Sequence, residues 1–282
     1  MILLQYRTDL AIEKEELLPE SDKKGVFVHR WNKDNTDITL VEVKDEFGEK
    51  SIGKPKGKYY TIKLPEFSHE TELLDGRLTA ITNTIKDLLP FSEGLILVAG
   101  VGNDNITPDA LGPLCAEQIF VTRHIEDVLT DDSLMPELHP VSAISTGVLG
   151  QTGLEAAEYI KAIVDSIKPV AVVVIDALAS KGIAHLGKTI QLSDTGISPG
   201  SGVGNYRKKI DSKYLGIPVI AIGVPTVVDG KSINETLEET ENMIVTPSDI
   251  DTIIHRASKL LALSINCALH QNVEPQLLLS LM

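Results

Sequence analysis

The chain has 282 residues, of which 43% are hydrophobic and only 4% aromatic, and its formal net charge at pH 7 is −14. A chain of this length and composition can bury one large core built mostly from Val, Ile, Leu and Ala. The strong negative charge disfavours direct nucleic-acid binding, which requires a basic face. Its two cysteines, Cys115 and Cys267, lie in apolar contexts that are typical of core residues in a reducing compartment.

The first residues lack the basic region and the long apolar run of a signal peptide. No apolar run elsewhere approaches the ~20 residues that span a membrane. We therefore expect a cytoplasmic protein with no membrane partner. Residues 1–24 are polar and acid-rich after the first turn, so this segment is expected to be disordered or docked in part as a helix.

The N-terminal region predicts a small antiparallel β meander. Apolar residues alternate over 26–43 around a turn at 32–37, and residues 59–64 (YYTIKL) form a further strand pattern after a flexible loop at 53–57. The lysines and acids of this region are interpreted as a solvated face.

Strand and helix patterns then alternate over about 90–270. Short apolar runs predict strands at 95–99, 141–145, 170–175, 190–192 and 217–224, and helical spacing covers 69–89, the region after Thr107, 154–167 and 248–270. This alternation predicts an α/β fold with a mixed, mostly parallel sheet and helices on both faces, preceded by the β meander.

Two aspartates follow buried strands of the predicted sheet. Asp109 lies one turn beyond the strand at 95–99, and Asp176 directly follows the run VAVVVI at 170–175. Open α/β sheets place their sites at this edge. One such aspartate alone is more often a cap or turn residue, but a pair favours function because two close carboxylates tend to share a proton. One can then act as base and the other as acid, which suits water attack on a peptide bond.

A glycine-rich loop follows the strand at 190–192. Its residues 194–196 (DTG) match the pepsin-like proteases, but a single copy inside an α/β pattern indicates a turn instead. The run at 200–204 (GSGVG) could cradle an anion or face a substrate. Ser201 has no nearby base in the sequence that would mark a nucleophile. The seven histidines form no H-x-x-x-H or H-E-x-x-H pair, so we predict neither a metal site nor a cofactor.

Several long motifs resemble the germination (spore) protease family of endospore-forming bacteria: GVGNDNITPDALGP, PVSAIS, VIDALAS, SDTGISPGSGVGN and LGIPVIAIGVPTVVD. The resemblance covers nearly all of the chain. It implies an atypical aspartic-type endopeptidase that begins the degradation of small acid-soluble spore proteins during germination, in the forespore or spore core. It also implies a homotetramer made as a zymogen. The family's proposed catalytic aspartates lie in TPDALGP and IDALA, at Asp109 and Asp176 of this sequence.

The N-terminus carries an imitation of the family's cleavage sites, which contain an acidic residue, a hydrophobic residue, Ala, any residue and Glu. Residues 9–13 (DLAIE) have this form, so the resemblance implies self-cleavage between Asp9 and Leu10. Residues 1–9 would be the propeptide, and 10–282 a single peptidase domain with 20–65 as a β-rich subregion. From charge alone, Arg207 or Lys208 is expected to bind the acidic residue before the cut.

Two alternatives stay open. The first motif also resembles the hydrogenase-maturation endopeptidases, in which the acid matching Asp109 binds a metal and a later strand ends in Asp-Ala. That resemblance supports the α/β sheet and leaves metal-dependent processing as an alternative function. The other alternative is a non-catalytic binding or assembly protein on the same fold, although two intact acids and an intact cleavage pattern favour an enzyme.

Overall fold

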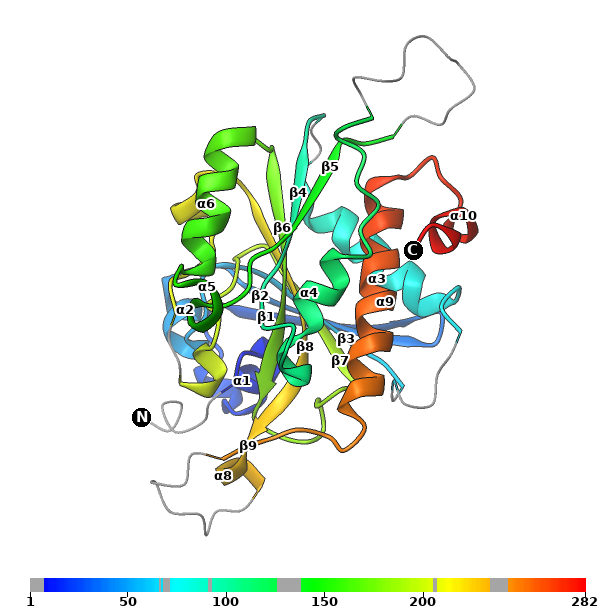
Figure 1. Ribbon diagram of the computed structural model, residues 1–282. Coiled ribbons are helices and arrows are strands. Elements are labelled where there is room, and N and C mark those ends of the chain that lie inside the picture. Colours follow the sequence, from blue (N-terminus) through cyan, green and yellow to red (C-terminus); the bar gives the residue numbers. More distant parts are fainter. Residues whose placement is uncertain are drawn as a thin grey trace.

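A computed structural model of the chain describes residues 8–65, 67, 72–90, 93–125, 138–204, 207–233 and 243–282. These residues form one sheet in the strand order β1-β2-β3-β7-β8-β6-β4-β5, and β9 pairs with β8 (Figure 1). The strands are β1 (Val26–Lys33), β2 (Thr36–Val43), β3 (Gly57–Lys63), β4 (Ile96–Gly100), β5 (Val141–Ser145), β6 (Ala171–Ser180), β7 (Thr189–Ser193), β8 (Val219–Asp229) and β9 (Ile244–Val245).

The helices surround this sheet. They are α1 (Ala11–Glu16), α2 (Glu46–Ile52), α3 (Gly76–Leu88), α4 (Leu111–Ala116), α5 (Leu149–Thr152), α6 (Ala156–Ile167), α7 (Ser212–Leu215), α8 (Gly230–Ile233), α9 (Ile250–Leu269) and α10 (Pro275–Ser280). Short 3-10 turns cover Glu20–Asp22, Thr107–Asp109 and Ser201–Val203. Within the described ranges, no helix combines the length and the apolar character needed to cross a membrane.

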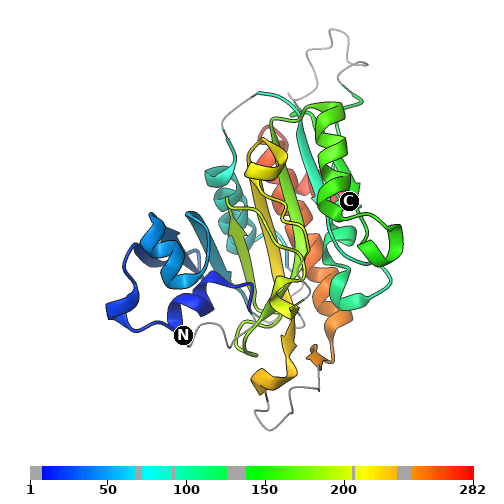
Figure 2. The same ribbon diagram turned by 90° about the vertical axis from the view of Figure 1, so that its left-hand side faces the viewer.

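The sheet has a parallel part and an antiparallel part. β4 pairs in parallel with β5 and β6, and β6 pairs in parallel with β8. β7 runs antiparallel to both β8 and β3, so it joins the parallel strands to the meander β1-β2-β3, which lies at one edge of the same sheet (Figure 2). The predicted mixed α/β fold with an N-terminal β meander is therefore confirmed.

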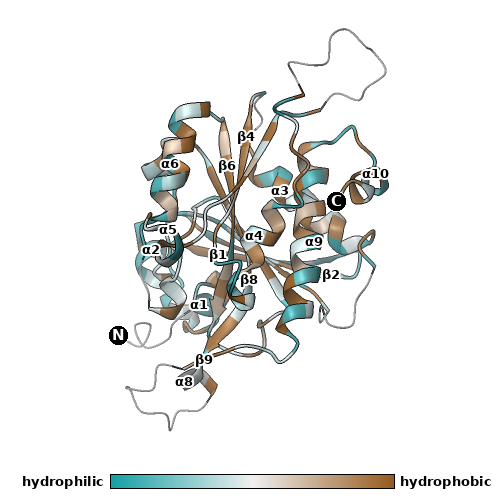
Figure 3. Ribbon diagram, in the orientation of Figure 1, coloured by the Kyte–Doolittle hydropathy of each residue, from teal (hydrophilic) through white to brown (hydrophobic). Residues whose placement is uncertain are grey.

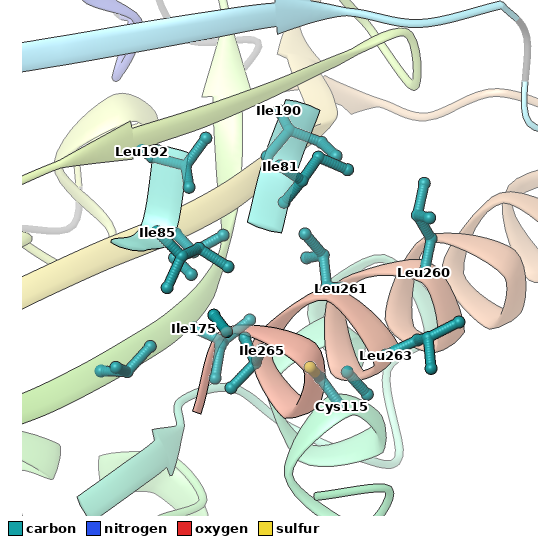
Figure 4. Close-up of a cluster of buried hydrophobic side chains, with 14 of the residues drawn as sticks. Ile81, Ile85, Cys115, Ile175, Ile190, Leu192, Leu260, Leu261, Leu263 and Ile265 are labelled. Carbon is teal, nitrogen blue, oxygen red and sulfur yellow. The ribbon is translucent and has the colours of Figure 1, made fainter. Parts of the chain in front are cut away.

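Helices cover both faces of the parallel strands, as the sequence predicts. On one face, α3, α4 and α9 pack apolar side chains against β6 and β7, and Figure 4 shows Ile81, Leu261 and Ile175 meeting there. On the other face, α6 and α7 pack against β4 and β6. The central strands are accordingly hydrophobic along their length (Figure 3), because they are buried on both sides.

The strand that carries Asp176 is longer than the sequence predicts. The apolar run ends at Ile175, but β6 stays paired with β8 as far as Ser180, with a shift of register between Leu178 and Ala179. Asp176 therefore lies within the strand rather than at its end. The extra length is stabilised by a segment distant in sequence, because Leu10 and Ile12 pack on Leu178.

Several helices also differ from the expected ones. α3 begins only at Gly76, whereas the sequence predicts a helix from residue 69, and residues 69–71 lie outside the described residues. The region after Thr107 first forms the 3-10 turn Thr107–Asp109, and α4 begins only at Leu111. α2 is not anticipated by the sequence pattern. It begins where the Asp45 side chain accepts the N–H of Gly48 at 2.9 Å, and it ends at Gly53, whose φ of 62° is left-handed.

Candidate active site

Asp109 is held in the turn between β4 and α4. Its Oδ2 accepts the N–H of Asn103 at 2.8 Å. A Cβ on Gly102 would lie 2.0 Å from the carbonyl oxygen of Asp109, and the φ of Gly102 is +130°, so this close approach requires glycine. Burial raises the pKa of Asp109, and the N–H of Asn103 opposes part of that rise.

Asp176 projects from β6 on the face that also carries Val172 and Val174. Only 4% of the residue is exposed. Burial raises its pKa well above the usual range, and the nearby charges of Asp109 and Asp9 raise it further. The two aspartates singled out by the sequence are therefore close enough for the charge of Asp109 to raise the pKa of Asp176.

Both acids line one cavity of about 590 Å³. Its walls come from the turn after β4, the glycine-rich loops around 147–150 and 199–203, and the outer part of β6. Asp9, from the N-terminal segment, lines the same cavity. The structure thus brings together three of the acids that the sequence analysis names: Asp9, Asp109 and Asp176.

The residues on either side of the expected cleavage bond are buried against β6. The N–H of Asp9 donates to the carbonyl of Ala179 at 2.9 Å. The Asp9 carboxylate accepts the N–H of Ala179 at 2.9 Å and the Ser201 hydroxyl at 2.6 Å. Leu10 is fully buried between Leu178 and neighbouring apolar side chains. Asp9 therefore lies at the wall of the cavity that contains both catalytic candidates, and the expected cleavage bond joins it to the buried Leu10.

The bond is also held from the side of β7 and the 53–57 loop. The carbonyl oxygen of Asp9 accepts Lys54 Nζ at 2.7 Å and Gln191 Nε2 at 3.1 Å. Gln191 Oε1 accepts the N–H of Ala11 at 2.7 Å. Further along, the Glu13 carboxylate accepts the N–H groups of residues 181 and 182 and the Thr8 hydroxyl. The segment 8–13 is thus bound through both its backbone and its acidic side chains.

Arg207 and Lys208 line the cavity but have acidic partners of their own. Arg207 lies 3.9 Å from Glu155. Lys208 lies 3.4 Å from Glu158 and stacks over the Tyr214 ring. The donors recorded for the Asp9 carboxylate are instead the uncharged N–H of residue 179 and the hydroxyl of residue 201.

The DTG sequence at 194–196 begins with an aspartate whose side chain joins two strands of the sheet. Asp194 Oδ1 accepts the N–H of Lys58 at 2.8 Å, which ties the end of β7 to the start of β3. A Cβ on Gly57 would lie 2.3 Å from the same oxygen. Asp194 therefore has a structural contact, although this contact joins two strands, whereas the sequence analysis expects Asp194 to form a turn. Within the described ranges, no group of three or more His, Cys, Asp or Glu could hold a metal ion.

Sequence reasoning missed Lys54, Gln191 and the role of Ser201 in binding a carboxylate. Lys54 was interpreted as part of a solvated face, and nothing in its neighbourhood in the sequence distinguishes it from Lys56. Gln191 carries a detectable signal, because an amide between Ile190 and Leu192 in an apolar strand must find hydrogen-bond partners.

Comparison with known proteins identifies the family of the chain. The sequence profile described as germination protease matches residues 7–240. The chain is 41% identical to the germination protease of Caldanaerobacter subterraneus subsp. tengcongensis, with 95% of each chain aligned. It is 38% identical to that of Clostridium tetani, over 96% of this chain and 97% of the relative. The chain belongs to the germination protease family. It is therefore a peptidase, a hydrolase of peptide bonds, with an endopeptidase role in germination.

A solved structure of the [NiFe] hydrogenase maturation protease HycI from Thermococcus kodakarensis KOD1 also matches. The identity is 20% and the TM-score is 0.37, over 64% of this chain and 98% of that chain. At this identity and TM-score, the likeness says nothing about a metal or a substrate of this protein.

Proposed function

We propose that this peptidase is of an atypical aspartic type, with Asp109 and Asp176 as the catalytic acids, and that it is made as a zymogen cleaving itself between Asp9 and Leu10. One observation carries the proposal: Asp9 lines the same cavity as the two acids, and its charge contributes to the raised pKa of Asp176. A buried pair of carboxyls that shares one proton can supply both a base and an acid near neutral pH.

The chemistry assigns the acids different roles. Asp176 is the more deeply buried, so it holds the shared proton and acts as the acid. Asp109, whose ionised form is favoured by the N–H of Asn103, accepts a proton from water. The water oxygen bonds to the carbonyl carbon of Asp9. As the bond to Leu10 breaks, Asp176 delivers its proton to the nitrogen of Leu10, so both products are released as an acid and an amine.

The bound segment explains how the zymogen would be silent. While Asp9 fills the site formed by Ala179 and Ser201, an acidic residue of another protein cannot enter it. The proposed propeptide is 1–9, of which 1–7 lie outside the described residues, and the proposed peptidase domain is 10–282. Family membership supports the further proposals of small acid-soluble spore proteins as substrates, a homotetramer, and a location in the forespore or spore core.

The test is to incubate the purified full-length chain and identify its new N-terminus by mass spectrometry. We expect a product that begins at Leu10, and no product from Asp109→Asn or Asp176→Asn, since each amide nearly matches the shape of the carboxyl it replaces. Asp194→Asn is the matched control and should keep substantial activity. A folded wild-type chain that cuts neither itself nor a spore protein would favour a binding or assembly role instead.

A further inference from the structure

The carbonyl oxygen of Asp9 is held by two side-chain donors from elements that carry neither catalytic acid. Lys54 reaches it from the loop between α2 and β3, with Nζ at 2.7 Å. Gln191 reaches it from β7, with Nε2 at 3.1 Å. This oxygen belongs to the bond that the proposed function expects to be cut, so both donors contact the atom on which negative charge develops during hydrolysis.

The orientation of the Gln191 amide is fixed by a second contact. Its Oε1 accepts the N–H of Ala11 at 2.7 Å, so its Nε2 must face the carbonyl oxygen of Asp9. The residue is 8% exposed. A buried amide whose two ends bind residues on both sides of one peptide bond is suited to align that bond as well as to donate to it.

Lys54 places its ammonium group beside this oxygen. Its pKa is lowered to about 8, mainly by burial and also by the charges of Lys14 on α1 and of Lys209 before α7, whereas the charge of Asp9 opposes this lowering. The Tyr59 ring of β3 lies 5.9 Å from Nζ. At neutral pH the group is therefore still largely cationic, and a cation in a buried site stabilises a nearby oxyanion strongly.

We propose that Lys54 and Gln191 form the oxyanion-binding site of this peptidase. The inference rests on the proposed cleavage between Asp9 and Leu10. When water bonds to the carbonyl carbon, the electron pair of the C=O double bond moves onto the oxygen that both donors contact. When the tetrahedral intermediate collapses, that pair re-forms the double bond, the C–N bond breaks, and the nitrogen of Leu10 takes the proton held by Asp176. No co-reactant other than water is needed.

The same donors would act on substrates in trans. Once the propeptide has left, an acidic residue of a substrate would bind Ala179 and Ser201 in place of Asp9. Its own carbonyl oxygen would then face Lys54 and Gln191. One site would therefore recognise the acidic side chain and polarise the bond that follows it.

The experiment measures the rate of self-cleavage of full-length Lys54→Met, Lys54→Arg and Gln191→Met. Lys56→Met is the matched control, because Lys56 lies two residues along the same loop and is exposed. Loss of one oxyanion donor typically slows a reaction by ~10²–10³. We expect a loss of about that size for Lys54→Met and a smaller loss for Gln191→Met. The control should cleave at the wild-type rate, and thermal unfolding should show that all four variants fold.

A pH series separates an oxyanion role from a merely structural one. An arginine keeps its charge over the range in which Lys54 loses its proton. The ratio of the Lys54→Arg rate to the wild-type rate should therefore rise as pH passes through about 8. The effect of the catalytic acids cancels in this ratio, since both proteins carry them.

Two results overturn the inference while leaving the proposed function intact. One is a folded Lys54→Met chain that cuts itself at a rate within threefold of wild type. The other is a rate ratio for Lys54→Arg that stays flat across the pH series. A wild-type chain that cuts neither itself nor a substrate refutes the inference and the proposed function together.

Discussion

Asp9 and Ala179 form a reciprocal pair across 170 residues of sequence. The N–H of Asp9 donates to the carbonyl of Ala179, and the N–H of Ala179 donates to the Asp9 carboxylate, each at 2.9 Å. Ala179 lies three residues beyond Asp176 on the same strand. The strand that carries one of the proposed catalytic acids therefore also positions the acidic residue before the expected cut.

Gly202 should be essential for binding the acidic residue. A Cβ at this position would lie 2.3 Å from Oδ2 of Asp9 and 2.6 Å from the Cβ of Ala179. Gly202→Ala should slow self-cleavage about tenfold or more, since overpacking of this kind costs about 1–3 kcal/mol. Gly150→Ala is the control, because it lines the same cavity and its Cβ would meet nothing. Quantifying the cleaved fraction over time tests both variants, and equal rates would contradict this account of the site.

Most strands and helices could be predicted from the sequence, because the spacing of their apolar residues indicates which side chains are buried. The strand at 95–99 and the helix at 248–270 correspond closely to β4 and α9, and the strand at 217–224 corresponds to the first part of β8. The outer part of β6 could not be predicted, because residues 10–12 cover it from the other end of the chain. α2 was missed because its stability depends on its capping residues Asp45 and Gly53 rather than on an apolar stripe.

Some residues of the candidate site could also be predicted from the sequence, and others could not. Asp109 and Asp176 could be found because acids next to buried strands are costly unless they are bound or used. Lys54 could not be found in this way, because its contact with the Asp9 carbonyl oxygen forms only where a surface loop meets the N-terminal segment. Charge alone favoured Arg207 and Lys208 as partners of Asp9, but it could not reveal that Glu155 and Glu158 stand beside them.

Reversing the charge at Asp9 should block processing. The Asp9 side chain is buried and its charge acts on both Lys14 and Lys54, so a lysine there would add a further cation beside them. It would also face the N–H of Ala179 and the Ser201 hydroxyl, which now donate to the Asp9 carboxylate. Asp9→Lys should reduce self-cleavage at least about a hundredfold, since an uncompensated buried charge costs about 3–5 kcal/mol. Asp251→Lys makes the same change of charge on an exposed position of α9 and should process normally. Normal processing of Asp9→Lys would exclude the acidic-residue site described here.

Asp176→Asn should stabilise the fold while it abolishes cleavage. The folded-state pKa of Asp176 lies above its unfolded value, so its ionisation costs stability progressively as pH rises from about 4. The neutral amide avoids this cost, and at neutral pH we expect a gain of about 1 kcal/mol. The difference in unfolding free energy between the variant and wild type should shrink as pH falls toward 4. Chemical denaturation at several pH values measures it, and a difference of the opposite sign would contradict the burial argument.

Removal of metal ions distinguishes a pair of carboxyls from metal-assisted hydrolysis. If Asp109 and Asp176 alone activate the water, prolonged chelation followed by dialysis should leave the rate of self-cleavage unchanged. Loss of activity on chelation, with recovery after one divalent ion is added back, would assign the water to a metal instead. Circular dichroism before and after chelation identifies the third outcome, in which the ion is needed for folding and its loss unfolds the chain.

The rate of self-cleavage should be higher in mildly acidic than in alkaline buffer. Burial raises the pKa of Asp109 and of Asp176, and the mutual repulsion of the two charges raises the pKa of Asp176 further, so the pair still holds one proton in mild acid. Rising pH removes that proton and with it the acid that serves Leu10. Lys54 loses its charge above about 8, which lowers the rate in the same direction. Falling pH eventually protonates both carboxyls and removes the base, so the profile is bell-shaped.

Mass spectrometry of the Leu10 product over a pH series measures the profile, and a rate that climbs steadily into alkali would rule out the shared-proton mechanism.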